Sequence, residues 1–215
     1  MTRTILRRSR VWSFPAVFAA VVLAGCSGAS GDSGTGAASP SPSQSSASTT
    51  PTPTPTPSAV YKPASAEGPA ENVPLPVMPE EAKVESKEGL EAFARYWYEA
   101  ANYGYETGDV GLVQAISSPD CVTCQKYYEV VENGFKDSDW MANAAIEVLG
   151  VHSDFLLTPE GRYQALVHFR QDKMEYYGPE GLQTVGEPDA AVVQLVEAIR
   201  LNEHWQVVNI ATIKG

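Results

Sequence analysis

The sequence predicts an α+β domain in which three N-terminal helices pack on a curved antiparallel sheet of about four strands. Between residues 87 and 134, apolar residues recur every three or four positions, the period of an amphipathic helix. After Trp140 the period changes to two, as in half-buried strands. Because the helices precede the strands instead of alternating with them, the order is that of an α+β domain.

Three helices are expected before Trp140. The first covers about residues 87 to 105 and is ended by Gly108. Its apolar stripe consists of Leu90, Phe93, Ala94, Trp97, Ala101 and Tyr105. A short second helix is expected around Val110, Leu112, Val113 and Ile116. The third opens with Ser118 as N-cap and Pro119 in its first turn, and it ends near Gly134.

Four strands are expected after Trp140. The first reaches about residue 157, and residues 158–161 form a turn into the second. The second strand has an inner row of Tyr163, Ala165, Val167 and Phe169, and an outer row of Arg162, Gln164, His168 and Arg170. Residues 178–189, with two prolines, are expected to form a loop. The third and fourth strands cover residues 191–201 and 205–213.

The first 25 residues have the layout of a secretory signal peptide. Four arginines precede an apolar stretch, which is shorter than the roughly 20 residues that a membrane-spanning helix needs. The Leu-Ala-Gly-Cys run ending at Cys26 resembles a bacterial lipobox, whose cysteine is lipidated and becomes the first mature residue. This resemblance implies that acyl chains on Cys26, palmitate among them, hold the protein to the extracytoplasmic face of the cell membrane. A retained membrane helix is the alternative.

Residues 27–58 contain only Asp32 and Gln44 besides Ser, Thr, Gly, Ala and Pro. Such a segment cannot bury enough apolar surface to offset its ordering entropy, so it is expected to be disordered. Four Thr-Pro pairs stiffen it toward polyproline II. The predicted organisation is a signal peptide over residues 1–25, a lipidated cysteine with a disordered tether over 26–85, and the α+β domain over 86–215.

The charge balance excludes some partners. The chain carries 15 basic and 26 acidic residues, a net charge of -11, and the four arginines before Cys26 have no acidic counterpart. The mature chain therefore has 15 - 4 = 11 basic and 26 acidic residues, a net charge of -15. So acidic a chain is repelled by phosphate backbones, and we expect no nucleic-acid partner. No cofactor is expected either.

The chain resembles two known groups of proteins. The long first helix and the final hairpin around Trp205 are similar to the cone-shaped, nuclear-transport-factor-2-like fold, which includes ketosteroid isomerases, polyketide cyclases and many binding modules. More closely, the chain resembles an uncharacterised family of actinobacterial lipoproteins with a Ser/Thr/Pro tether and a Cys-x-x-Cys domain. The matching parts are Cys26, the tether, residues 97–105, residues 118–124 and the Trp205 strand. This resemblance implies no known activity.

Lipidation of Cys26 would leave Cys121 and Cys124 as a pair, which outside the cytoplasm is expected to form a disulfide. Because a helix N-terminus lowers the pKa of a thiol, a redox-active pair is the alternative. No strand of a thioredoxin-like unit precedes the pair, however, and Gln125 stands where c-type haem attachment needs His. With three histidines in the chain, no zinc site is expected. The residues favour a structural disulfide.

A possible ligand pocket lies in the last hairpin. If its strands pair through a three-residue loop at 202–204, Glu197 lies opposite Asn209 within an apolar face. The flanking pairs in that register are Leu201 with Trp205, Ile199 with Val207, Leu195 with Ala211, and Val193 with Ile213. If this face were a concave pocket shared with Trp97, burial would raise the pKa of Glu197 and make it a candidate general base. Alternatively, a bulge turns Glu197 outward or the carboxylate pairs with a buried donor.

His152, Ser153 and Asp154 are the residue types of a hydrolase triad, but neighbours on a strand face opposite ways, so Ser153 cannot meet the other two. The sequence therefore favours a non-enzymatic lipoprotein that binds an envelope protein or a small ligand. The alternatives are a cone-fold enzyme of isomerase or dehydratase type that uses Glu197 and Asn209 on a small apolar ligand, and a thiol–disulfide protein.

Overall fold

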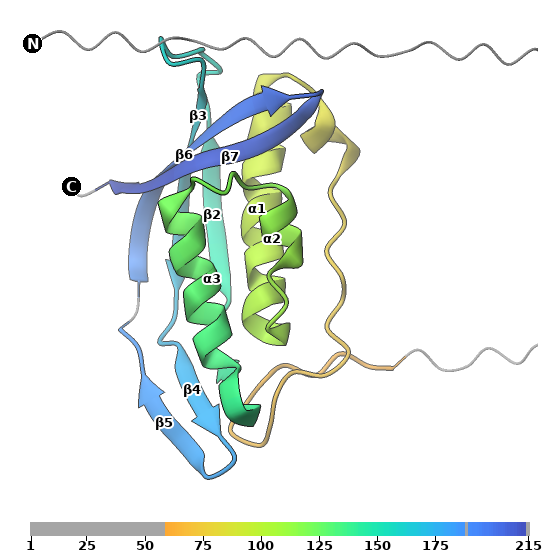
Figure 1. Ribbon diagram of the computed structural model, residues 1–215, viewed down its shortest axis with the longest axis vertical. Coiled ribbons are helices and arrows are strands. Elements are labelled where there is room, and N and C mark those ends of the chain that lie inside the picture. Colours follow the sequence, from red (N-terminus) through yellow and green to blue (C-terminus); the bar gives the residue numbers. More distant parts are fainter. Residues whose placement is uncertain (1–58, 188, 214–215) are drawn as a thin grey trace, which may run out of the picture. The chain divides into compact units, whose positions relative to one another are not determined.

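A computed structural model describes residues 59–187 and 189–213 of the chain (Figure 1). The predicted signal peptide, Cys26 and the Thr-Pro pairs lie outside the described residues. The elements run from helices to antiparallel strands, which confirms the predicted α+β class. Among the described residues, no helix combines the length and the apolar character that crossing a membrane requires.

The long first helix, α1 (Lys87–Thr107), has clear signals at both ends. The Ser86 hydroxyl caps its N-terminus by accepting a hydrogen bond from the N–H of Gly89 at 3.0 Å. At the C-terminal end, Gly108 adopts a left-handed φ of +79°, which glycine tolerates without steric cost. The predicted helix over residues 87–105 is confirmed and continues to Thr107.

Two shorter helices follow, α2 (Gly111–Ala115) and α3 (Val122–Gly134). The sequence predicts Ser118 as the cap of the third helix, but the cap is Cys121, whose sulfur accepts a backbone N–H at 3.3 Å. Ser118 instead donates its own N–H to the carbonyl of Val207 at 2.7 Å. The prediction was wrong because this bond to a distant strand holds residues 118–120 in a turn outside the helix.

The strands form two antiparallel sheets. The four-stranded sheet has the order β2-β3-β6-β7, with β2 (Ile146–His152), β3 (Tyr163–Gln171), β6 (Asp189–Leu201) and β7 (His204–Ile213). The three-stranded sheet has the order β1-β4-β5, with β1 (Trp140–Ala142), β4 (Glu175–Gly178) and β5 (Gly181–Val185). The larger sheet is the predicted one, whereas β5 lies where the sequence predicts a loop. The side chains of β5 are mostly exposed on both faces, so they carry no alternating signal.

The first predicted strand is shorter than expected and ends at His152. Ser153 turns inward, where its hydroxyl donates to the carbonyl of Gln164 at 2.6 Å and its N–H donates to the Glu91 carboxylate at 2.8 Å. Phe155 then adopts a φ of +53°, which is incompatible with extended backbone. The predicted turn is confirmed, since the N–H of Gly161 bonds the carbonyl of Thr158 at 2.9 Å.

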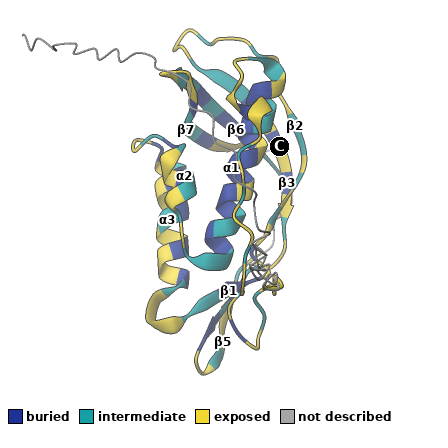
Figure 2. Cartoon of the chain, turned by 90° about the vertical axis from the view of Figure 1, so that its right-hand side faces the viewer, coloured by how far each residue is buried: buried dark blue, intermediate teal, exposed yellow. Residues whose placement is uncertain are grey.

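The core lies between α1 and the inner face of the four-stranded sheet, and Figure 2 shows α1 buried along most of its length. The sheet residues in it are Ala165, Val167 and Phe169 of β3, Val196 and Ala198 of β6, and Trp205, Val207 and Ile210 of β7. The predicted inner row of the second strand is therefore confirmed. On the far side of α1, the hydroxyl of Tyr127 in α3 donates to the carbonyl of Ala101 at 2.9 Å.

The final hairpin has a two-residue turn, Asn202-Glu203, instead of the predicted three-residue loop. Both residues have positive φ, of 48° and 67°, as in the tight turns that suit the twist of paired strands. Leu201 consequently pairs with His204. A bulge between Glu197 and Ala198 then shifts the register, so that the predicted pairing of Glu197 with Asn209 is confirmed.

Side chains of α1 close the edge of β2. Asn102 binds both backbone groups of Ile146, since its amide donates to the carbonyl at 2.9 Å and its oxygen accepts the N–H at 2.7 Å. Arg95 donates to the carbonyl of Val148 at 3.4 Å. At the other edge of the sheet, β7 is covered by residues 116–118, which bond both backbone groups of Val207. Both edges of the four-stranded sheet therefore have partners within the chain.

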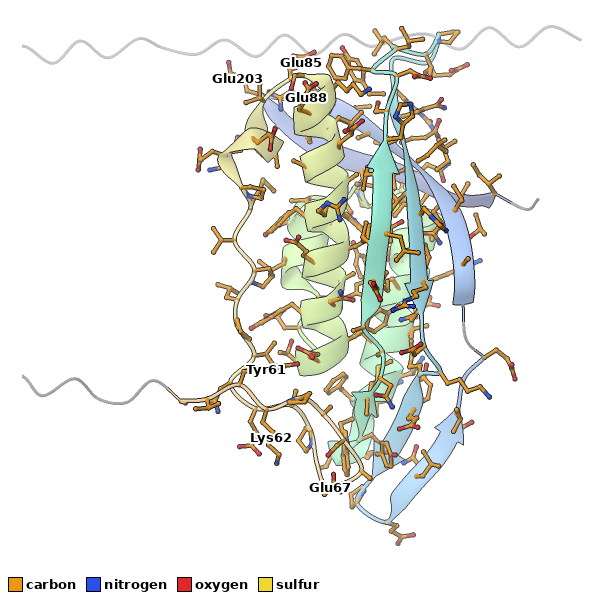
Figure 3. The ribbon with its side chains drawn as sticks, turned by 180° about the vertical axis from the view of Figure 1, so that it is seen from behind. Tyr61, Lys62, Glu67, Glu85, Glu88 and Glu203 are labelled. Atoms are coloured by element: carbon orange, nitrogen blue, oxygen red, sulfur yellow. A yellow bond between two sulfur atoms is a disulfide. The ribbon has the colours of Figure 1, made fainter. Side chains whose placement is uncertain are left out.

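Residues 59–85 contact the helices and strands, although the sequence assigns them to the disordered tether. Tyr61 donates to Glu106 at the C-terminal end of α1, while Glu85 and Glu88 lie at its N-terminal end (Figure 3). The indole N–H of Trp140 donates to the carbonyl of Ser65 at 2.8 Å. These contacts place the start of the packed unit before residue 86, the boundary that the sequence predicts.

We expect Asn102→Ala to lower the free energy of unfolding by about 2 kcal/mol, because it removes two hydrogen bonds and leaves both backbone groups of Ile146 unpaired. Urea unfolding followed by tryptophan fluorescence measures the change. The matched control is Asn133→Ala, an exposed helical position whose side chain contacts Lys136, with an expected effect below about 0.5 kcal/mol. Equal midpoints for the two variants would contradict this role of Asn102.

Candidate functional site

Glu197 lies on the outer face of the four-stranded sheet, away from α1. Its neighbours along β6, Val196 and Ala198, are fully buried in the core. Because side chains alternate along a strand, the Glu197 side chain between them points to the other face. Across the sheet, Glu197 pairs with Gln164 on one side and Asn209 on the other. The condition for a carboxylate inside a concave pocket, an inward-facing Glu197, is therefore not met. The bulge next to Glu197, which the sequence analysis weighed as the alternative, accompanies this outward orientation.

Three donors surround the Glu197 carboxylate. Arg162 donates to Oε2 at 2.8 Å, Gln164 donates to Oε1 at 2.9 Å, and Asn209 donates to Oε2 at 3.1 Å. The Glu197 side chain is only 13% exposed, whereas that of Arg162 is 39% exposed. We call these four residues the Glu197 cluster. It links strands β3, β6 and β7 and the residue that precedes β3.

The pKa of Glu197 is lower than usual. Burial acts to raise this pKa, but the hydrogen bonds from Gln164, Asn209 and Arg162, together with the charge of Arg162, outweigh it. The raised pKa that the sequence analysis attached to a concave pocket therefore does not apply to Glu197. A carboxylate that is held ionised by three donors is a weak base, so the arrangement suits a fixed charge on the sheet surface better than proton abstraction. The assignment of Glu197 and Asn209 as catalytic residues stays a prediction without support from this geometry.

No local sequence pattern connects Arg162 and Gln164 with Glu197. Both residues belong to the predicted outer row of the second strand, and their neighbour Ala165 is buried in the core. The missing information was the β3–β6 register, in which Gln164 pairs with Glu197. The outer row was predictable from period two, but the strand that lies beside it was not.

A small cleft of about 190 Å³ lies beside the Glu197 cluster. It lies between the residues that follow β2 and the outer side chains of Gln164, Leu166 and Leu195. Pockets for small ligands have volumes of roughly 300–1,000 Å³, so this cleft is small for one. His152 and Asp154 contact each other at its rim, with Nε2 and Oδ1 3.2 Å apart. Ser153 also lines the cleft, but it is buried and its hydroxyl donates to the carbonyl of Gln164 at 2.6 Å.

An apolar strip crosses the outer face next to the cluster. Cross-strand pairing places Leu166, Leu195 and Ala211 in one row, and Val193 and Ile213 in the row beside it. We call these five residues the outer strip. Leu166 is 39% exposed and Ile213 is 47% exposed. The pairs Leu195–Ala211 and Val193–Ile213 were predicted correctly, but they lie on the solvent side of the sheet, not in the core.

Trp97, the other predicted pocket residue, belongs to the core. It is 4% exposed, and its indole N–H donates to the hydroxyl of Ser117 at 2.9 Å. Its ring packs edge-on against Tyr98, with the centroids 5.1 Å apart, and in a tilted arrangement against Tyr127, with the centroids 5.9 Å apart. Trp97 therefore lies on the opposite side of the sheet from Glu197 and Asn209, and the structure does not bring the three predicted residues together.

The predicted disulfide between Cys121 and Cys124 is confirmed. Both residues are fully buried. A role in thiol–disulfide exchange predicts an accessible sulfur at Cys121, so this burial gives the redox alternative no support. Within the described residues, no group of three or more His, Cys, Asp or Glu side chains is arranged to hold a metal ion.

Comparison with known proteins identifies the family. The sequence model of a family of unknown function, DUF6318, matches residues 59–211. The chain belongs to the DUF6318 family. The DUF6318 region includes the segment 59–85, in agreement with the contacts that this segment makes with α1 and Trp140. The comparison with curated proteins finds no match.

Two solved structures are similar to the chain at low identity. One is the intermembrane space region of the chloroplast protein ARC6, with 10% identity and a TM-score of 0.41 over 60% of this chain and 98% of that one. The other is an uncharacterized protein with a cystatin-like fold from Caulobacter vibrioides, with 14% identity and a TM-score of 0.35 over 56% of this chain and 87% of that one.

We expect Glu197→Gln to lower the free energy of unfolding by about 1 kcal/mol at pH 7, because it removes the charge that Arg162 and two amides contact. The folded-state pKa of Glu197 is below 4.5, so the wild-type contribution is complete above that pH and is lost as the pH falls through the lower, folded value. The difference between variant and wild type, measured by urea unfolding, should therefore shrink below pH 4.5.

The matched control is Glu147→Gln, because Glu147 pairs with Arg170 on the same sheet but both side chains are more than half exposed. Its expected effect on the free energy of unfolding is below about 0.5 kcal/mol, both at pH 7 and below pH 4.5. A Glu197→Gln effect that is as small as the control, or that does not change with pH, would show that the Glu197 cluster does not stabilise the sheet.

Proposed function

We propose that this DUF6318 protein is a lipid-anchored extracytoplasmic module that binds another protein of the cell envelope through the outer strip. The observation that carries the proposal is the exposure of apolar side chains from three adjacent strands on the sheet face that α1 leaves uncovered. Contiguous apolar surface on a folded protein commonly marks an interaction site.

The shape and the surroundings of the outer strip favour a protein partner over a small ligand. The adjacent cleft is small, at about 190 Å³, whereas the strip extends across β3, β6 and β7. Charged side chains flank it, with the Arg162–Glu197 pair on one side and the Arg170–Glu147 pair on the other. An apolar centre with a polar rim is the usual composition of a protein–protein interface.

The proposed location rests on the N-terminal sequence. The basic residues, the apolar stretch and the small residues before Cys26 support secretion and lipidation. The buried disulfide between Cys121 and Cys124 supports an oxidising compartment, because disulfides are rare in the cytosol. The resemblance to actinobacterial lipoproteins supports the same location, since a Ser/Thr/Pro-rich segment precedes the DUF6318 region here as well.

For the anchor, we expect Cys26→Ala to abolish the incorporation of labelled palmitate and to move the protein out of the membrane fraction of the producing cell. A single acyl chain binds membranes only marginally, so stable retention depends on the full lipid modification of this residue. The matched control, Ser27→Ala, should leave both readouts unchanged. Membrane retention of the Cys26→Ala protein would contradict lipid anchoring and favour a retained membrane helix.

For the outer strip, we expect a photo-crosslinking amino acid at Leu166 to give a discrete adduct with one envelope protein in intact cells. The adduct should be lost when Leu195→Lys is added, because Leu195 pairs directly with Leu166 in the same row and a lysine there places a charge in the apolar centre. The same crosslinker at Leu75, which is 61% exposed on the N-terminal segment, is the control and should not give this adduct. An adduct common to both positions, or one that survives Leu195→Lys, would count against the strip.

A further inference from the structure

The strand β5 forms an open edge of the three-stranded sheet. In the order β1-β4-β5, β5 pairs with β4 alone among the described strands. Figures 1 and 3 show β5 at the outer margin of the fold, with no described element beyond it. In the four-stranded sheet, by contrast, Asn102 and Arg95 bond the edge of β2 at Ile146 and Val148, and residues 116–118 bond the edge of β7 at Val207. We propose that β5 accepts an extended basic peptide segment of a partner protein as an additional strand.

The residues of β5 suit strand addition. The sequence Gly-Leu-Gln-Thr-Val contains no charged residue and no proline, the residue types that commonly protect an exposed edge from pairing. Leu182 is 55% exposed and Val185 is 43% exposed, so both are available to contact side chains of an added strand. The backbone hydrogen bonds of such a strand would supply affinity, and the alternating side chains would supply specificity.

The charges beside β5 indicate a basic occupant. A hollow of about 560 Å³ adjoins its N-terminal half, and the carboxylates of Asp137, Asp139 and Glu180 line it. Asp139 is fixed in this hollow, because it accepts a hydrogen bond from the Gln183 amide at 3.0 Å. A lysine or arginine of the added strand would meet these carboxylates at the rim of the molecule.

The same charges disfavour a second copy of this chain as the occupant. Antiparallel pairing of β5 with β5 of another copy would bring two sets of these carboxylates close to each other, on proteins that are already acidic.

A bulge at Gln183 interrupts the regular edge, since Leu182 and Thr184 pair with the successive β4 residues Tyr177 and Tyr176. The added strand therefore has a short regular stretch, which fits a transient interaction.

This inference is independent of the outer strip, because β5 belongs to the other sheet. The test uses the chain from residue 26 onward and a fluorescein-labelled peptide, Lys-Thr-Val-Lys-Val-Thr-Lys, with binding measured by fluorescence anisotropy. Thr184→Lys adds a positive charge in the middle of the edge and should weaken binding by about tenfold or more. The matched control Gln125→Lys adds the same charge to the exposed side of α3 and should change binding by less than about twofold.

Three further measurements decide the proposal. A peptide with glutamates in place of the lysines should bind about tenfold more weakly or not at all. Backbone amides of residues 181–185 should gain protection from hydrogen exchange when the basic peptide is added, which non-specific charge attraction would not produce. Leu195→Lys, a substitution in the outer strip, should leave peptide binding unchanged. A failure of the outer-strip proposal is therefore distinguishable from a failure of the β5 proposal.

The proposal is overturned if the basic peptide does not bind, if Thr184→Lys and Gln125→Lys weaken binding equally, or if amides 181–185 gain no protection. It is also overturned if the chain forms a dimer in light scattering that Thr184→Lys dissolves, since the occupant is then a second copy. Urea unfolding of Thr184→Lys shows whether the variant is folded. If it is not, Asp139→Asn with Glu180→Gln replaces it, and basic-peptide binding as tight as that of the wild type overturns the proposal.

Discussion

Burial of α1 on several sides is the constraint on which the rest of this structure depends. Its apolar stripe packs on the inner face of the four-stranded sheet, and its aromatic residues contact α3 through Tyr127. Gly104 permits the contact between α1 and Tyr127, because a Cβ at that position would lie 2.0 Å from the hydroxyl of Tyr127. The polar side of α1 is used as well, since Asn102 and Arg95 bond the open edge of β2.

The position of α1 also decides what the opposite face of the sheet presents. Val196 and Ala198 face α1, so Glu197 and Leu195 face outward. The outer face then combines an ion-paired, hydrogen-bonded carboxylate with exposed leucine and isoleucine side chains. The ionised Glu197 carboxylate and the small size of the adjacent cleft support the proposed contact surface over a catalytic pocket. The two proposed binding regions, the outer strip and β5, lie on different sheets and therefore allow different partners.

Much of the fold could be predicted from local signals. The spacing of Leu90, Phe93 and Trp97 predicts α1, Gly108 predicts its end, and the alternation along β3 predicts its buried row. The disulfide between Cys121 and Cys124 followed from an even count of cysteines once Cys26 was set aside. The candidate site was predicted in part, since Glu197 and Asn209 do pair. Their partners, Gln164 in β3 and Arg162 just before it, lie more than 30 residues from Glu197 in the sequence.

The sequence by itself determined the features that depend on composition and on residues close to one another. These are the basic leader before Cys26, the acidic chain after it, the tether composition, the three helices and the strands of the larger sheet. Only the tertiary structure decided which face of β6 is buried, because packing against α1 selects that face. The pairing of Glu197 with Asn209 was preserved, since the bulge beside Glu197 compensates for the two-residue turn at Asn202. It also decided that β5 is a strand with an open edge, because pairing with β4 forms a strand that residue period alone does not reveal.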